Sequence, residues 1–211
     1  MKNLLFLAGL MISALSYAQD KQQMQFEQNG FIGISIGPSI PLGDFGSTNL
    51  NNQKGGFADR GRSYNLNGAY FFHTNFGISA NVFLQSWDSD VPYEKTRWSY
   101  HSSGFLLGGI ATVPKGKFNF DFNLQLGYAN SSRDQLTHPL HSFVDVMVPK
   151  ATGEALAYSI GLGTRLHVGK GIDMMLAYSY FNSKPTLGKK WYSTDYDISV
   201  NNFTLGIGYR I

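Results

Sequence analysis

Hydrophobic and polar side chains alternate along much of the chain with a period of two residues. The clearest case is residues 118–128, where Phe, Leu and Tyr occupy the even positions while Asn, Asp, Gln and Gly occupy the odd ones. Successive side chains of a β-strand point to opposite faces of a sheet. The pattern therefore predicts strands that have one apolar wall and one polar wall.

The same alternation predicts eight strands, and most of them are long. They reach or exceed the ~9 to 11 residues that a tilted strand needs to cross a bilayer, whereas strands of soluble proteins average ~5 to 6 residues. After the first 18 residues, no apolar run is long enough to predict a membrane-spanning helix. The predicted strands cover residues 30–38, 62–73, 76–87, 103–113, 118–130, 154–168, 172–182 and 199–211.

The connections between these strands alternate between short and long. Short periplasmic turns and long extracellular loops are typical of outer-membrane barrels, and lipid offers no hydrogen bonds to an open sheet edge. We therefore expect an all-β fold, a single transmembrane up-and-down antiparallel β-barrel of eight strands with both ends on the periplasmic side. Tight turns are predicted at residues 74–75, 114–117 and 169–171, and long loops at 39–61, 88–102, 131–153 and 183–198. Within the third loop, residues 143–148 are expected to extend a hairpin beyond the membrane and not to add a strand.

The apolar wall of each predicted strand is expected to contact lipid, and the polar wall to face a narrow lumen. The lumen-facing positions carry mostly small residues, which an eight-stranded barrel requires because its interior holds only side chains. Aromatic residues at the strand ends predict two girdles at the depth of the lipid headgroups. The expected girdle beside the short turns contains Phe72, Phe76, Phe118 and Tyr209, and that beside the long loops contains Trp87, Trp98, Tyr100 and Tyr180.

The N-terminus has the pattern of a secretory signal peptide. Lys2 supplies the positive charge, residues 4–15 form a short apolar stretch, and Ser16-Tyr17-Ala18 fits the small-x-small cleavage pattern. The alternative, a retained anchor helix, would need a longer apolar run of ~20 residues. We expect a cleaved signal peptide at residues 1–18, a periplasmic tail at 19–29 and an outer-membrane barrel domain at 30–211.

Composition narrows the functional classes. Charged residues make up 15% of the chain, against ~25% in ordinary soluble domains, and there are 24 Gly residues. The chain has no Cys, which excludes disulfides, thiolate metal sites and a lipidated Cys. The formal charge of +3 comes without a Lys or Arg cluster, so nucleic acid is not an expected partner.

Two short motifs resemble those of a known family. The chain ends in Gly206-x-x-Tyr209-x-Ile211, which resembles the C-terminal signal that the outer-membrane barrel assembly machinery reads, although that signal usually ends in Phe. Residues 37–45, Gly-Pro-Ser-Ile-Pro-Leu-Gly-Asp-Phe, resemble the strand-exit motif of the small outer membrane protein beta-barrel domain, or porin-like, family. The resemblance covers residues 30–211. It implies an eight-stranded barrel and no shared catalytic set.

The most structured polar group of the sequence is predicted inside the barrel near the short turns. If the turn at residues 169–171 closes a hairpin, His167 lies opposite Asp173, with Arg165 on the same inner face. Asp121 and Arg210 are expected at similar depth. Buried charges must be paired, so these five residues are expected to form a nearly neutral plug. The alternative is a gate for small solutes.

Other candidate sites are weaker. His101 and Ser103 share a strand face, and their spacing resembles part of the site of barrel enzymes that deacylate lipid A, but Gly104-Phe105 departs from that family's motif and no partnering acid is evident. His138 and His141 are separated by a Pro, and no carboxylate or Cys cluster completes a metal site. No cofactor is expected.

The sequence therefore predicts a monomeric, non-enzymatic barrel surrounded by outer-membrane lipid, with a structural or surface-interaction role carried by its extracellular loops. Four exposed aromatic residues of these loops are candidate contacts for an extracellular ligand, although belting at the membrane surface explains them as well. They are Tyr93, Trp98, Trp191 and Tyr192. A narrow channel for small or apolar solutes is the second hypothesis, and a lipid A-modifying enzyme is the third.

Overall fold

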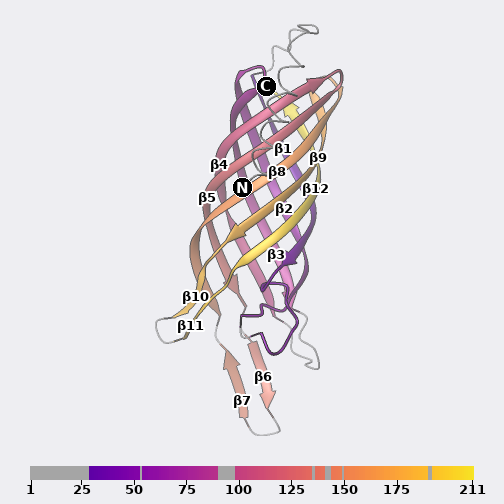
Figure 1. The fold of residues 1–211 in the computed structure, drawn as a ribbon. Coiled ribbons are helices and arrows are strands. Elements are labelled where there is room, and N and C mark those ends of the chain that lie inside the picture. The colour runs from indigo at the N-terminus through magenta and orange to yellow at the C-terminus, as the bar shows by residue number, and fades with distance from the viewer. Residues whose placement is uncertain are drawn as a thin grey trace, which may run out of the picture.

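Eight long antiparallel strands close into one barrel, which confirms the predicted fold class (Figure 1). The computed structural model describes residues 29–52, 54–89, 98–134, 136–140, 144–148, 150–189 and 192–211. The expected signal peptide and all of the expected tail except Asn29 lie outside these residues. In the described part of the chain, no helix has the length and hydrophobicity needed to cross a membrane.

Each barrel strand pairs with its neighbour along the chain, and the first strand pairs with the last. The barrel strands are β1 (Gly30–Leu42), β2 (Ala58–His73), β3 (Phe76–Ser89), β4 (Ser99–Lys115), β5 (Phe118–Arg133), β8 (Ala151–Gly169), β9 (Ile172–Ser183) and β12 (Ile198–Arg210). Two further hairpins, β6 (Leu136–Leu140) with β7 (Val144–Val148) and β10 (Thr186–Lys189) with β11 (Tyr192–Asp195), belong to the long loops. The β6–β7 pair confirms that this part of the third loop adds no strand to the barrel.

We call the end with the tight turns the short-turn end and the opposite end the loop end. In Figure 1 the short-turn end is at the top, and the hairpins β6–β7 and β10–β11 are at the bottom. Following paired residues from Ile34 through β2, β3, β4 and β5 leads to Leu156 on β8, whereas the path through β12 and β9 leads to Leu166. Because the two paths arrive ten residues apart, the strands must tilt around the barrel axis.

Most strands extend further toward the loop end than the sequence predicted. β1 was expected to end at Pro38, yet it continues to Leu42. Pro38 has no amide hydrogen, so the pairing of β1 with β12 is interrupted at Gly37 and Pro38 and resumes at Ser39, opposite Asn202. A Cβ atom at Gly37 would collide with the carbonyl oxygen of Phe203, so the close approach of the two strands requires glycine there. The hydrogen-bonded pairing of β1 with β12 therefore continues beyond the proline.

The turn between β8 and β9 sets the register of the predicted polar group. Lys170 and Gly171 have φ values of 48° and 79°, as in the tight turns that suit the twist of a hairpin. The register shifts between His167 and Gly169, so Val168 is an extra residue on its strand. This bulge places His167 opposite Asp173.

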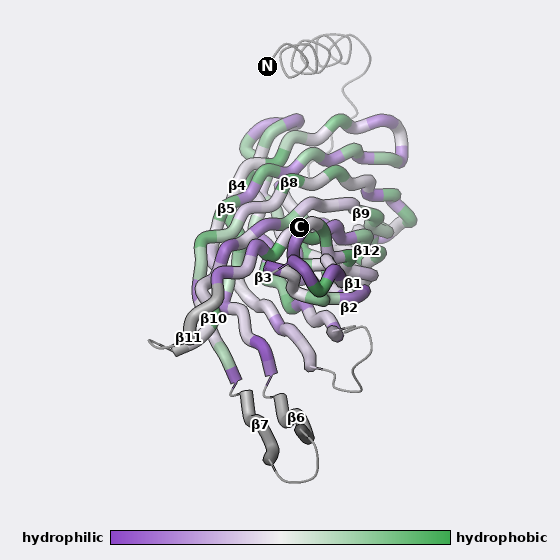
Figure 2. The backbone as a smooth tube through the Cα atoms, turned by 60° about the horizontal axis from the view of Figure 1, so that its bottom comes forward, coloured by the Kyte–Doolittle hydropathy of each residue, from purple (hydrophilic) through white to green (hydrophobic). Residues whose placement is uncertain are grey.

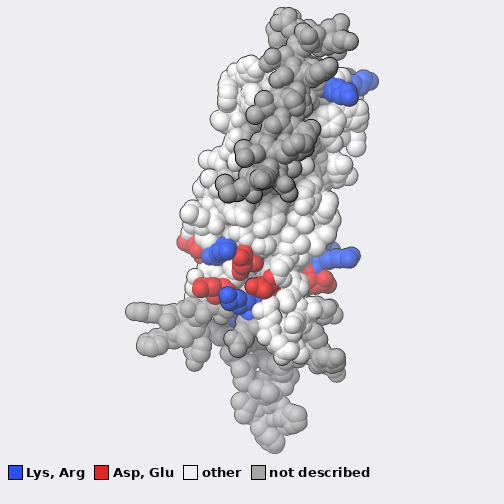
Figure 3. All heavy atoms as spheres, viewed as in Figure 1, with Lys and Arg blue, Asp and Glu red and all other residues white. Residues whose placement is uncertain are grey.

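The two walls of the barrel differ as predicted. Hydrophobic and hydrophilic residues alternate along the strands (Figure 2), and the expected lipid-facing residues are exposed on the outside of the barrel. On the face shown in Figure 3, charged side chains gather toward the loop end and at the tip of the short-turn end, with an uncharged band between them. An outer wall of this kind suits the hydrocarbon region of a membrane.

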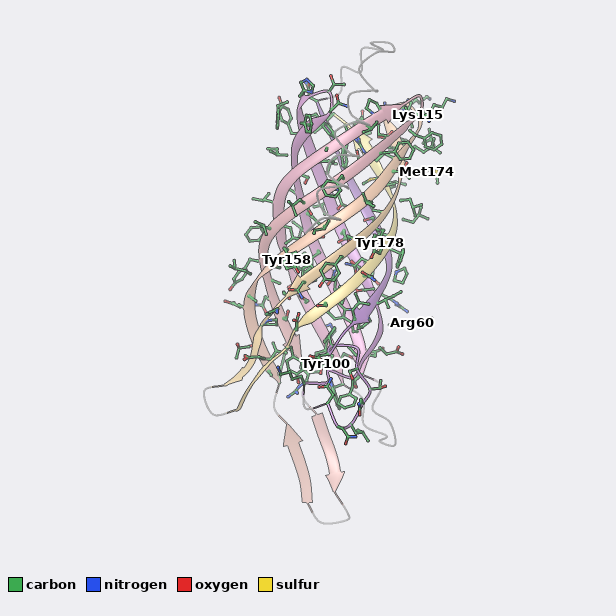
Figure 4. The ribbon with its side chains drawn as sticks, viewed as in Figure 1. Arg60, Tyr100, Lys115, Tyr158, Met174 and Tyr178 are labelled. Atoms are coloured by element: carbon green, nitrogen blue, oxygen red, sulfur yellow. The ribbon has the colours of Figure 1, made fainter. Side chains whose placement is uncertain are left out.

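The girdle beside the short turns is as expected, but the girdle beside the long loops is different. Phe72, Phe76, Phe118 and Tyr209 are all exposed on the outer wall. By contrast, Trp87 and Tyr100 are only 1% and 2% exposed and lie inside the barrel, so their assignment to the loop-end girdle was wrong. Each has the strand parity of the inner wall, because Leu84 on β3 and Phe105 on β4 point outward. The outward aromatic residues on the loop side are Tyr64, Tyr128, Tyr158 and Tyr178, together with the half-buried Tyr180 (Figure 4 labels Tyr158 and Tyr178).

These walls make a depth-dependent prediction. Leu124→Arg, at the middle of the apolar band, should lower the free energy of unfolding by ~2 to 4 kcal/mol, whereas Leu156→Arg, at its loop-side edge, should cost ~1 kcal/mol or less. Both leucines point outward on adjacent strands, with 50% and 83% of their surface exposed. Urea unfolding in liposomes measures both values. Equal costs would contradict the assigned depths.

Candidate functional site

The structure brings all five residues of the predicted polar group together inside the short-turn end. Arg165 donates from Nε and Nη2 to the two carboxylate oxygens of Asp121, at 2.6 and 3.0 Å. Thr112 donates its hydroxyl to the same carboxylate at 2.6 Å. Arg165 Nη1 also lies 3.9 Å from an oxygen of Asp173. Asp121, Arg165 and Asp173 are buried, so this is a desolvated ion-pair network and not a surface salt bridge.

The second half of this network fixes the protonation state of a histidine. Arg210 lies with Nε 3.2 Å from Oδ1 of Asp173 and with Nη2 2.6 Å from Nε2 of His167. His167 Nδ1 lies 3.3 Å from the same Asp173 oxygen. A guanidinium has only donors, so Nε2 must accept and Nδ1 must carry the proton. His167 is therefore neutral in this arrangement, and two guanidiniums balance two carboxylates.

Aromatic rings complete this blockage of the lumen. The guanidinium carbon of Arg165 lies 4.2 Å from the ring centroid of Phe31 and 5.3 Å from that of Phe71. Phe31 also packs in a buried cluster with Ile110 and Met175. The cation is thus held by carboxylates on one side and by ring faces on the other. We call Asp121, Arg165, His167, Asp173 and Arg210, with these rings, the short-turn plug.

A small polar cavity lies beside the short-turn plug, on its loop side. Its volume is about 80 Å³, and Asp121 and Arg165 line it on the plug side. Asn67 donates to Ser35 at 3.0 Å, and Gln125 donates to Ser79 at 2.9 Å. The cavity is large enough for a few water molecules. Its other lining residues include Asn65, Asn81, Asn123, Ser159, Ser179 and Thr204. We call this space the polar chamber.

Buried aromatic residues close the lumen on the loop side of the chamber. The rings of Phe83 and Phe181, each the next inward residue after a chamber position, meet edge to face with centroids 5.0 Å apart. Further out, Phe45 meets the rings of Trp87 and Tyr100, both at 5.2 Å between centroids. These residues belong to one buried hydrophobic cluster, which we call the loop-end cap.

Two of the large rings of the cap have their polar atoms hydrogen-bonded, whereas Nε1 of Trp98, which packs against the cap, is buried without a partner among the described residues. Trp87 Nε1 donates to Ser39 at 2.9 Å, and the Tyr100 hydroxyl donates to the carbonyl of Gly56 at 2.9 Å. Gly56 lies in the first loop, and its amide bonds the carbonyl of Asp44 at 2.9 Å. The first loop thus folds inward and inserts Phe45, which is only 1% exposed, into the mouth of the barrel.

Ion pairs stabilise the rim outside the cap. Lys184 Nζ lies 2.9 Å from Asp197, joining the ends of β9 and β12, and the hydrogen bond raises the pKa of Lys184. Burial by itself would raise the pKa of Asp197, but hydrogen bonds from Lys184, Asn182 and Ser199 outweigh it and lower that pKa. Both groups therefore stay charged at neutral pH.

The structure supplies an acid partner for His101 that sequence reasoning missed. His101 Nε2 on β4 lies 3.3 Å from a carboxylate oxygen of Asp134, and both groups are exposed. Asp134 follows β5, and only the register of β4 with β5 reveals the pairing. Among the described hydrogen bonds, none joins His101 to Ser103, so the arrangement lacks the base–nucleophile contact of a serine hydrolase.

The remaining sequence candidates fall in different places. His138 lies in β6, and His141 is outside the described residues, as are Tyr93 and Trp191. No group of three or more potential metal ligands occurs within the described ranges. At the end of β12, Tyr209 and Ile211 are exposed on the outer wall, and Gly206 pairs with Ser35.

Comparisons with known proteins agree on the fold. A family model described as outer membrane protein beta-barrel domain matches residues 4–210. The structure of Neisserial surface protein A is similar with a TM-score of 0.53 at 13% identity, over 87% of this chain and 97% of that one. Ail, the attachment invasion locus protein of Yersinia pestis, was crystallised with the heparin analogue sucrose octasulfate; it gives 0.51 at 17% identity, over 87% and 99%. No curated protein matches the sequence.

The short-turn plug makes a prediction about coupled charges. Arg165→Leu should lower the free energy of unfolding by ~3 to 5 kcal/mol, because Asp121 would remain buried without its cation. The double variant Arg165→Leu/Asp121→Leu should lose less than Arg165→Leu alone, because it removes the unpaired charge. Urea unfolding in liposomes measures the unaltered chain, Arg165→Leu, Asp121→Leu and the double variant. If the two single losses simply add in the double variant, the ion pair is not the source of the effect.

Proposed function

The chain belongs to the outer membrane protein beta-barrel domain family, and from that premise we propose that it acts at the cell surface through its loop end and conducts nothing through its lumen. The observation that carries the proposal is the double blockage of the lumen. A hydrated ion or solute would have to pass both the loop-end cap and the short-turn plug, which are buried and internally bonded. Eight strands leave little space beyond their own side chains.

The loop end extends far enough beyond the membrane-spanning part of the barrel to form an interaction surface. Strands β4, β5 and β8 have 16 to 19 residues, more than the ~9 to 11 needed to span the hydrocarbon. Hairpins β6–β7 and β10–β11 continue beyond the barrel. The short-turn end offers only tight turns. We assign the loop end to the outside of the cell, as is usual for such barrels.

The charges of the loop end suggest which ligands it would favour. Side chains of positive and negative charge are interspersed there. They are Asp59, Arg60, Arg62, Asp195 and the Lys184–Asp197 pair. A surface of this kind does not steer one class of charged ligand. Ail shows that a barrel of this fold can form a complex with a sulfated sugar, but the mixed charges here favour a ligand recognised by hydrogen bonds and aromatic contacts.

We also propose that the outer-membrane assembly machinery inserts the chain by reading Gly206, Tyr209 and Ile211. What supports this is their position at the C-terminal end of the last strand, with both large side chains pointing away from the lumen. These residues are thereby available to a partner before β12 pairs with β1.

Deletion of the hairpins tests the surface role. Residues 136–148 and, separately, residues 188–193 are replaced by short Gly-Ser linkers, which should leave the barrel ladder intact because both hairpins form sheets of their own. The second replacement keeps Leu187, which is buried in the loop-end cap. Cells expressing the full chain should aggregate or adhere to immobilised proteins or polysaccharides above a vector control, and at least one deletion should abolish this. Adhesion that is absent from the full chain, or unaffected by both deletions, would contradict the proposal.

Conductance tests the closed lumen. The purified protein in planar bilayers should give no discrete channel events. Phe45→Ala should also be silent, because the short-turn plug shares no residue with the cap. Reproducible single-channel steps from the unaltered chain would favour the narrow-channel hypothesis instead.

A further inference from the structure

A recess on the outer wall lies outside everything assigned so far. It has a volume of about 370 Å³ and spans strands β2 to β5 near the loop end. Outward-pointing residues form most of it, including Tyr64, Leu84, Ser86, His101, Ser103 and Asn130. The wall is hollow here because three of its outward positions carry serine, namely Ser86, Ser103 and Ser132.

On the opposite side of the barrel, tyrosine rings cover the outer wall at a similar depth. On β9, Tyr178 and Tyr180 point outward, and their hydroxyls donate to Asn201 at 2.9 Å and to Ser199 at 3.4 Å. Tyr158 stands beside Tyr180, with ring centroids 6.0 Å apart. Rings bonded to strand residues thus occupy that side, whereas serines leave the β2–β5 side open.

The depth of the recess identifies the kind of molecule that reaches it. Leu66, Val82 and Phe105, the next outward residues toward the short-turn end, are about half exposed and belong to the apolar band. Toward the loop end, the next outward residues are Arg62 and Asp88. A ligand here would have a polar part in the recess and an apolar part against the band on its short-turn side. A lipid of the surrounding leaflet has this form.

The polar lining identifies the head group. It offers hydroxyls, one amide and one imidazole. The charged groups facing this region are Arg62, Asp88, which accepts from Ser99, Asp134 beside His101, and Glu154, which accepts from Tyr128 and from Asn130. Three carboxylates against one guanidinium disfavour a phosphate head, whereas hydroxyl, amide and carboxylate groups suit the donors and acceptors of a sugar. We propose that this recess binds the sugar head group of a glycolipid whose acyl chains lie along the apolar band.

Lipid titration with matched variants tests the proposal. The full chain is purified in mild detergent, and binding is measured by native mass spectrometry with dephosphorylated lipid A, an acylated glucosamine disaccharide. Phosphatidylglycerol and the deacylated disaccharide serve as comparison ligands. Asn130→Leu alters the recess, and Asn201→Leu makes the same change at a similar level on the opposite wall. Each variant is first shown to keep its heat-modifiable compact form on gels. If Asn130→Leu does not fold, Ser103→Leu, which fills the recess, replaces it.

The unaltered chain should bind the acylated disaccharide about tenfold more tightly than phosphatidylglycerol, and the recess variant should lose about tenfold, as expected for one lost hydrogen bond. Asn201→Leu should bind as the unaltered chain does. Equal binding of phosphatidylglycerol, or equal losses in both Asn variants, would overturn the proposal. Binding of the deacylated disaccharide as tight as that of the lipid would overturn it as well, because the acyl chains would then contribute nothing. None of these outcomes depends on the adhesion or conductance results.

Discussion

Every backbone amide and carbonyl that faces hydrocarbon must find its partner within the protein, because lipid supplies none. In this chain the requirement is met by the pairing of β1 with β12, which removes the last free sheet edges. The pairing of β1 with β12 is interrupted at Pro38 and resumes in the same register beyond it. Tilt, strand number and the narrowness of the lumen all follow from closing eight strands on themselves with an offset of ten residues.

A barrel of eight strands is so narrow that its interior must be filled by packed side chains. The polar wall cannot be hydrated like that of a wide channel, so its charges must neutralise one another and its rings must pack. These two kinds of packing lie at opposite ends of the lumen. Ion pairs and a neutral His167 lie near the tight turns, and packed aromatic rings lie near the loops. Between them, amides and hydroxyls line a cavity suited to water. The functions that we propose accordingly use the outer surfaces, which are the loop end and the lipid-facing wall.

The alternation of side chains was sufficient to predict the strands, their faces and the placement of Asp121, Arg165 and Asp173 on the inner wall, because parity along a strand is a local property. The same parity argument, applied consistently, would have placed Trp87 and Tyr100 inside; the expectation of a girdle took precedence over it. Other features depend on contacts between distant segments. The insertion of Phe45 into the mouth, the pairing of His101 with Asp134, and the recess formed by serines on three strands arise only from register and loop folding, which no single segment encodes.

The short-turn plug and the loop-end cap lie one after the other along the lumen, and this arrangement has a consequence for the cell. They share no residue and are separated by the polar chamber, so a thermal fluctuation that loosens one leaves the other shut. The chance that a continuous path exists at any instant is then the product of two small probabilities. The closed lumen that we propose would let a membrane carry many copies of this protein without a matching increase in leakage.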